Sequence, residues 1–105
     1  MTRVALLCPD LLFGSKLQGA LLAAGHEPVP AGEDAEILVV DLTDDAEARI
    51  EQSAQAGVPR LGFYSHVEQD VRRRAEEAGF DRVVPRSRMA REAAALVESM
   101  LAARR

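Results

Sequence analysis

The stretch Ala35-Glu36-Ile37-Leu38-Val39-Val40-Asp41-Leu42 decides the fold, because it carries the strongest strand signal in the chain. Its aliphatic side chains follow one another without polar alternation, which indicates a strand that is buried on both faces. Such strands are typical of the centre of a parallel sheet. A second run, Val4-Ala5-Leu6-Leu7-Cys8, is closed by Pro9 and has the same character. Together the two runs predict a parallel sheet at the core of the protein.

Strand and helix patterns alternate outward from these two runs. Helices are expected over residues 11–24, 45–56, 67–78 and 88–103, and further strands over residues 27–30, 58–65 and 82–84. Strands that alternate with helices imply a parallel sheet covered on both faces. We therefore expect an α/β fold, a flavodoxin-like three-layer sandwich whose five parallel strands have the order 2-1-3-4-5.

The composition fits one domain spanning residues 1–105. With 48% hydrophobic residues the chain is too apolar to be disordered, and no apolar run approaches the roughly 18 residues of a membrane span. The single cysteine, Cys8, excludes an intramolecular disulfide framework. The short apolar run near the start does not resemble a secretion signal, so we expect a cytoplasmic protein that does not bind membranes. A net charge of −4 and few aromatic residues argue against direct binding of nucleic acid.

The carboxyl ends of the strands mark the expected functional site. In open parallel sheets the functional crevice lies beyond these ends, near the point where the strand order reverses. This rule selects four short segments, which are Cys8-Pro9-Asp10, Asp41, Tyr64-Ser65-His66 and Pro85-Arg86.

At this point the chain resembles a response-regulator receiver domain. The stretch from Leu61 to Ser87 matches, in order, a strand that ends in a hydroxyl residue, a helix that ends in Glu77-Ala78-Gly79-Phe80-Asp81, and a short strand followed by Pro85-Arg86. Val39-Val40-Asp41-Leu42 is similar to the receiver strand that ends in the phosphoacceptor aspartate. The resemblance rests on the order and spacing of these segments over nearly the whole chain, and it implies the CheY-like form of the flavodoxin-like fold.

The resemblance also assigns roles at the site. In a working receiver three carboxylates hold Mg²⁺, one of them takes the phosphoryl group, and a hydroxyl and a lysine bind the phosphoryl oxygens. Phosphoryl transfer depends on such positioning and charge neutralisation. Asp41 falls on the phosphoacceptor position and Asp10 on one of two acidic positions, which makes these two the candidate metal ligands. Tyr64, or Ser65 after a one-residue shift, stands at the hydroxyl position, and Arg86 replaces the lysine.

Three features depart from the receiver pattern. Pro9 occupies the other acidic position, and the Met-Pro-x-x-Asp-Gly stretch usual after the phosphoacceptor is absent. Only residues 31–36 separate the second strand from Ile37, so the fold is truncated there and lacks a helix. These departures favour a degenerate pseudo-receiver, a signal-transduction module that acts by protein–protein interaction, with phosphorylation at Asp41 lost or weak. We expect no enzymatic activity and no cofactor, Mg²⁺ at Asp10 and Asp41 being the alternative.

The charged site residues and Cys8 allow further interpretations. We expect Arg86 to form a permanent ion pair with Asp10 and Asp41, because arginine pairs with carboxylates in bidentate fashion and can thereby replace Mg²⁺. Otherwise Asp41 only ends a buried strand and caps the next turn. The alternative function is phosphotransfer, through Asp41 or through Cys8, since the chain also looks a little like sugar-phosphotransferase B components, which carry a phosphocysteine after their first strand. A buried strand cysteine is the simpler interpretation of Cys8. A small-molecule sensor that uses the same crevice is the third interpretation.

A partner protein is expected on the face built by the helix at 67–78, the strand at 82–84 and the helix at 88–103. Receivers use this face to dimerise or to dock partners, so a homodimer is one form of the prediction. The candidate contact residues are basic or apolar, namely Arg72, Phe80, Arg82 and Met89, with Tyr64 as a further apolar candidate. We expect the apolar members of this set to be exposed.

Overall fold

The computed structural model describes residues 2–65 and 68–103 of the chain. Its strands are β1 (Arg3–Leu7), β2 (Glu27–Pro30), β3 (Ile37–Asp41), β4 (Arg60–Tyr64) and β5 (Arg82–Pro85). Its helices are α1 (Leu11–Ala23), α2 (Ala46–Gln52), α3 (Gln69–Glu77) and α4 (Arg86–Ala103). All neighbouring strands are parallel, in the order β2-β1-β3-β4-β5. The predicted α/β fold and strand order are confirmed.

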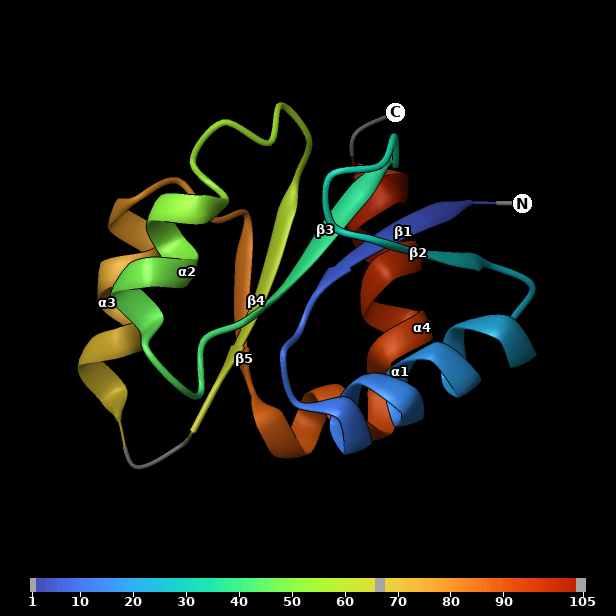
Figure 1. Cartoon of the computed structure of the whole chain (residues 1–105), viewed down its shortest axis with the longest axis horizontal. Coiled ribbons are helices and arrows are strands. Elements are labelled where there is room, and N and C mark those ends of the chain that lie inside the picture. Colours follow the sequence, from blue (N-terminus) through green and yellow to red (C-terminus); the bar gives the residue numbers. More distant parts are fainter. Residues whose placement is uncertain (1, 66–67, 104–105) are drawn as a thin grey trace.

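The helices form two layers, one on each face of the sheet (Figure 1). On one face α1 and α4 cover a core that includes Val4, Leu17 and Leu96. On the other face α2 and α3 cover a second core that includes Val40 and Val71. Every residue of β3 and β4 is buried, as the continuous aliphatic run of β3 predicted. None of the described helices is long and apolar enough to cross a membrane.

All four helices differ from their predicted bounds, α1 only in ending at Ala23 instead of residue 24. α2 ends at Gln52 instead of residue 56, because the chain turns at Ser53, whose hydroxyl donates back to the carbonyl of Ile50 over 3.1 Å. α4 begins at Arg86, directly after β5, and Glu92 interrupts its helical conformation with φ −128° and ψ 22°. The predicted start of the third helix at residue 67 lies outside the described residues, and α3 begins at Gln69.

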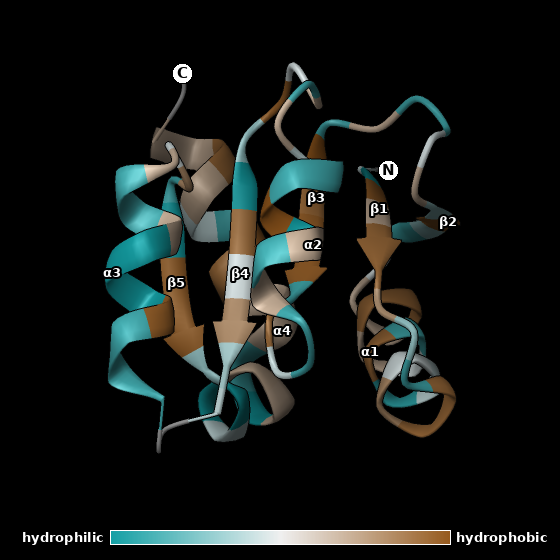
Figure 2. Cartoon of the chain, turned by 60° about the vertical axis from the view of Figure 1, so that its left-hand side comes forward, coloured by the Kyte–Doolittle hydropathy of each residue, from teal (hydrophilic) through white to brown (hydrophobic). Residues whose placement is uncertain are grey.

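The connection between β2 and β3 consists of residues 31–36 and contains no helix, so the predicted truncation is confirmed. Each face of a sheet in a three-layer sandwich is normally buried under helices. On the face that carries α2 and α3, none of the described helices lies over β1 (Figure 2). The truncation therefore leaves part of this face of the sheet without a covering layer.

Candidate functional site

The candidate site lies at the carboxyl ends of β1, β3, β4 and β5. Because these strands are parallel, the residues that follow them meet at one edge of the sheet. Cys8 and Asp10 follow β1, Asp41 ends β3, Ser65 follows β4, and Arg86 opens α4 directly after β5. His66 belongs to the predicted crevice but lies outside the described residues.

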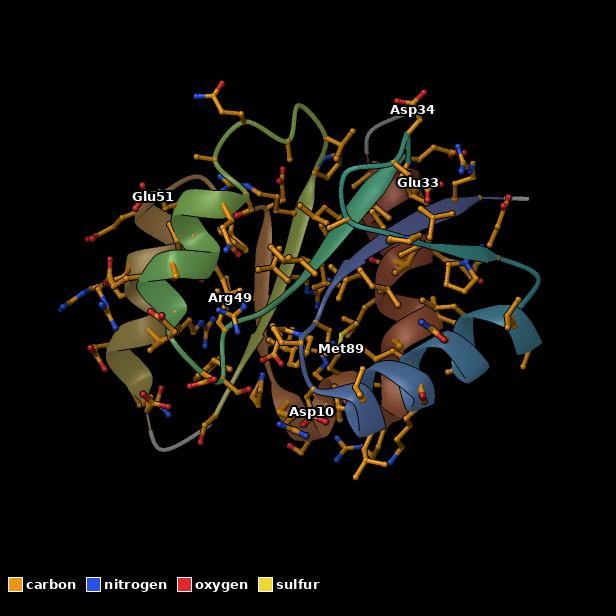
Figure 3. The ribbon with its side chains drawn as sticks, in the orientation of Figure 1. Asp10, Glu33, Asp34, Arg49, Glu51 and Met89 are labelled. Atoms are coloured by element: carbon orange, nitrogen blue, oxygen red, sulfur yellow. The ribbon has the colours of Figure 1, made fainter. Side chains whose placement is uncertain are left out.

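Asp10 joins the start of α1 to the start of α4. Its Oδ1 accepts a hydrogen bond from the backbone N–H of Phe13 over 3.1 Å, which caps α1. Its Oδ2 accepts a hydrogen bond from Nη2 of Arg86 over 2.9 Å, and this contact is also an ion pair. Figure 3 shows Asp10 at the beginning of α1, beside the first turn of α4. The predicted pairing of Arg86 with Asp10 is thus present.

Two further interactions hold this pair in place. The guanidinium carbon of Arg86 lies 4.2 Å from the centre of the Phe13 ring, the geometry of a cation–π contact. Two hydrogen bonds lower the pKa of the Asp10 carboxyl below its usual value, because they stabilise its charged form. The hydrogen bond from the backbone of Phe13 has the larger effect, and the one from Arg86 follows. Asp10 therefore stays ionised at neutral pH, and both of its oxygens are already engaged.

Asp41 is enclosed by its neighbours, and only 2% of its surface is exposed. Its Oδ1 accepts hydrogen bonds from the backbone N–H of Thr43, over 2.8 Å, and from the Thr43 hydroxyl. Its Oδ2 lies 3.6 Å from the sulfur of Cys8. No ion pair joins Asp41 to Arg86 in the described parts of the chain, so the predicted inclusion of Asp41 in the ion pair is wrong. The physical reason is that Thr43, two residues further along the chain, already donates hydrogen bonds to the Asp41 carboxylate. The carboxylate therefore does not require an arginine from a distant part of the chain.

Cys8 lies between the two acidic residues. Its sulfur is 3.6 Å from the backbone carbonyl oxygen of Asp10 and 3.6 Å from Oδ2 of Asp41. Burial, followed by the charge and the hydrogen bond of Asp41, raises the pKa of the Cys8 thiol from 9.0 to about 11. The thiolate is the nucleophilic form of cysteine, and at neutral pH Cys8 is a thiol.

These residues do not fit a Mg²⁺ site. Mg²⁺ needs several oxygen ligands in octahedral geometry. The carboxylate of Asp10 already accepts hydrogen bonds from Phe13 and Arg86, and Oδ1 of Asp41 already accepts one from Thr43. No cluster of three His, Cys, Asp or Glu side chains able to hold a metal occurs among residues 2–65 and 68–103.

The hydroxyl position is shared by Tyr64 and Ser65. Tyr64 is the last residue of β4 and is buried in the core under α3. Ser65 is half-buried and follows the strand, and its carbonyl accepts the backbone N–H of Glu68 over 2.9 Å. Ser65 is the less enclosed of the two residues. No hydrogen bond among the described residues joins either hydroxyl to Asp41.

The strand-end pattern in the sequence does not indicate that Thr43 and Phe13 belong to the site. The hydroxyl of Thr43 donates a hydrogen bond to Oδ1 of Asp41. The spacing Asp-x-Thr is a usable signal, because short polar side chains often bond across two residues in turns. Phe13 carries no comparable signal, since its role under Arg86 depends on how α1 and α4 pack together.

The predicted exposure of the apolar partner-face residues is wrong. Tyr64, Phe80 and Met89 are 2%, 6% and 0% exposed. Met89 points into the core between α4 and the sheet, as Figure 3 shows. Phe80 packs against the other core and lies beneath the guanidinium of Arg60, 4.3 Å from the ring centre.

The basic members of the predicted face are more accessible. Arg72 lies on the outer side of α3, where its Nε pairs with Glu76 over 3.3 Å. Arg82 is half-buried at the start of β5. That a partner binds the face built by α3, β5 and α4 remains a prediction. The residues of this face that a partner could contact are charged rather than apolar.

Two buried polar residues lie away from the site. Arg60 donates to the carbonyl of Ala78 over 2.8 Å and to the hydroxyl of Ser53 over 3.2 Å, so it ties α2 and α3 to the amino end of β4. His26 is buried, and its Nε2 lies 2.8 Å from Oε2 of Glu98. Both interactions link elements of the fold.

Comparison with known proteins gives a consistent fold. No family model matches the sequence, and no curated protein matches it significantly. The receiver domain of a Francisella response regulator has a TM-score of 0.81 and 10% identity, with 100% of both chains covered. A Thermotoga maritima response regulator has a TM-score of 0.81 and 12% identity, covering 97% of this chain and 98% of its own. A CheY-like receiver domain protein from Methanospirillum hungatei has a TM-score of 0.79 and 14% identity, covering 96% and 94%. Over its whole length, the chain has the fold of the response-regulator receiver (CheY-like) domains.

Proposed function

We propose that this protein is a pseudo-receiver, a signal-transduction module that acts by protein–protein interaction and is not phosphorylated at Asp41. The observation that carries the proposal is that Asp41 is buried and its carboxylate is already hydrogen-bonded. The residue is 2% exposed, and its Oδ1 accepts hydrogen bonds from both the N–H and the hydroxyl of Thr43. A phosphoacceptor must instead present a free oxygen to an incoming phosphoryl group.

The distribution of charge supports the same proposal. Phosphoryl transfer requires cations that neutralise the oxygens of the transferred group. The cation at this edge, Arg86, is bound to Asp10 and stacked on Phe13. Moving Arg86 toward Asp41 would break both contacts and leave Asp10 without its ion pair. On these grounds we propose a module without enzymatic activity and without a bound cofactor.

The phosphocysteine alternative is less well supported. A carrier cysteine must attack a phosphodonor as a thiolate. The pKa of Cys8, raised to about 11, keeps it protonated at neutral pH, and the neighbouring Asp41 would repel an incoming phosphate. The site therefore favours a structural role for Cys8.

The proposed partner is another protein. The face formed by α3, β5 and α4 presents Arg72 and Arg82, and a second copy of the chain is one candidate for this face. We further propose a cytoplasmic location.

Beryllofluoride, a phosphoryl mimic, tests the proposal. The ¹⁵N-labelled full chain is titrated with beryllofluoride and Mg²⁺, and amide shifts are followed by NMR, with a working receiver domain as the positive control. We expect the amides of Asp41 and Thr43 to keep their positions. Saturable, Mg²⁺-dependent shifts around Asp41 that disappear in Asp41→Asn would overturn the proposal and restore phosphotransfer.

A further inference from the structure

A groove of about 550 Å³ lies on the face of the sheet that carries α2 and α3. Its floor contains Ala5 and Leu7 of β1 and Leu38 of β3, and its walls come from the β2–β3 connection and from the end of α2 with the turn after it. The groove occupies the place where β1 has no helix over it (Figure 2). It is separate from the site at Asp41 and Arg86, neither of which lines it.

Five of the twelve residues that line the groove are alanine or glycine. Four of the lining residues are alanines, namely Ala5, Ala31, Ala35 and Ala56. A sheet face is stable when another layer buries it. On this face none of the described helices covers β1, and Leu7, Ala56 and Val58 are only half-buried. Their exposed apolar surface can therefore be covered by side chains from another molecule.

The rim of the groove is acidic. Glu33 and Asp34 line it from the β2–β3 connection, and none of the described Lys, Arg or His residues does so. Figure 3 shows both carboxylates on this loop. Glu33 pairs with Arg3 over 3.4 Å, and Asp34 has no ion pair within the described residues. Gln52 and Gln55 on the opposite wall add side-chain amides. An occupant with basic groups beside an apolar surface would complement both features.

We propose that the groove binds an amphipathic helix of a partner protein, with the apolar side of the helix on β1 and β3 and its lysines or arginines beside Glu33 and Asp34. The proposal deepens the proposed function and rests on its protein–protein part. It identifies a second binding surface, opposite the layer formed by α1 and α4.

The geometry favours a helix over other occupants. β1 is hydrogen-bonded to β2 and β3, and β3 to β1 and β4, so the floor of the groove offers no free strand edge for an added strand. A helix satisfies its own backbone and packs through side chains alone. A second copy of the groove would bring Glu33 and Asp34 toward the same acids, and like charges disfavour that contact.

Two helical peptides of about 15 residues test the proposal, a length at which designed helices begin to form in water. Both carry leucine and alanine on one face, and the other face carries lysine in one peptide and glutamate in the second. Each is titrated into the ¹⁵N-labelled full chain. We expect the lysine peptide to shift the amides of Ala5, Leu7, Leu38 and residues 31–35, and to bind at least tenfold more tightly than the glutamate peptide.

Matched variants locate the interaction. The double variant Glu33→Gln, Asp34→Asn should lower the affinity for the lysine peptide about tenfold, the effect of losing two exposed ion pairs. Glu36→Gln is the control, because Glu36 lies on the same loop and does not line the groove. Absence of binding, shifts elsewhere, equal affinity for the two peptides, equal effects of the variants, or a dimer formed through the groove would overturn the proposal. Phosphorylation of Asp41 would instead overturn the pseudo-receiver function and leave this result standing.

Discussion

The contact between Cys8 and Asp41 predicts a poorly reactive thiol. Burial, then the charge of Asp41 and its hydrogen bond, raise the pKa of Cys8 from 9.0 to about 11. Each unit changes the thiolate fraction tenfold, so at about pH 8 this fraction is lower by about 100-fold than for a cysteine with the ordinary pKa. Alkylation by iodoacetamide should be slower by nearly the same factor, because only the thiolate reacts.

Asp41→Asn separates the two causes of this shift. The substitution removes the charge of Asp41 and leaves the burial of Cys8 in place, so the pKa should fall but stay above 9.0. The rate at about pH 8 should then rise by roughly tenfold. Asp44→Asn is the matched control, since Asp44 is exposed, carries the same charge and lies three residues further along the chain. Its rate should equal that of the unmodified protein.

The assay is the pH profile of alkylation, read by mass spectrometry on the single cysteine of the chain. The inflection of the profile gives the pKa of Cys8 in each variant. An inflection at or below 9.0 in the unmodified protein would refute the reasoning. An unchanged inflection in Asp41→Asn would refute it equally, because it would mean that the thiol and the carboxylate do not interact.

The same shift affects stability at alkaline pH. Cys8 has a higher pKa in the folded protein than in the unfolded chain, so folding favours the protonated thiol. Its stabilising contribution is fully present below pH 9.0 and is lost as the pH rises through about 11. Since Cys8 is only half-buried, we expect a loss of about 1 kcal/mol rather than the full value of the shift. Urea unfolding of the protein and of Cys8→Ala over this pH range measures the difference.

Two further substitutions test the packing of the fold by urea unfolding. Gly62→Ala should lower the free energy of unfolding by about 1–3 kcal/mol, because a Cβ there would lie 2.8 Å from Cδ1 of Leu42. Gly19→Ala, with no neighbour within 4 Å, should be neutral or stabilising, and an equal loss in both would contradict the packing argument. Arg60→Met should cost about 3 kcal/mol, since it leaves buried hydrogen-bond acceptors unpaired. A loss below about 0.5 kcal/mol, typical of an exposed arginine, would contradict the role assigned to Arg60.

The sheet and its order could be predicted because their signals are local and repeated. The aliphatic run Ile37-Leu38-Val39-Val40 indicates burial on both faces, and every residue of β3 is buried. The stripe that places Ala93 and Leu96 in the core also includes Met89, four residues before Ala93. Extending that periodicity would have placed Met89 inside. Phe80 has no such signal, because its burial depends on Arg60 from another element.

The site could be predicted only in part, because position along the chain does not decide which partners meet. The pairing of Asp10 with Arg86 followed from the parallel order of β1 and β5 and from their opposite charges. The partner of Asp41 depended on competition between a distant arginine and a hydroxyl two residues away. Thr43 is the closer group in the chain, and it needs little ordering to reach Asp41, whereas Arg86 is already held by Phe13.

The position of the groove follows from the handedness of the fold. Crossovers between parallel strands are right-handed almost without exception. The crossover from β1 to β2 runs toward one edge and places α1 on one face. The crossover from β2 to β3 runs the opposite way past β1, so a right-handed path must lie on the other face, with α2 and α3. Shortening that crossover to residues 31–36 therefore uncovers β1 on that face alone. A missing helix at this point in the sequence thus fixes where the apolar groove opens.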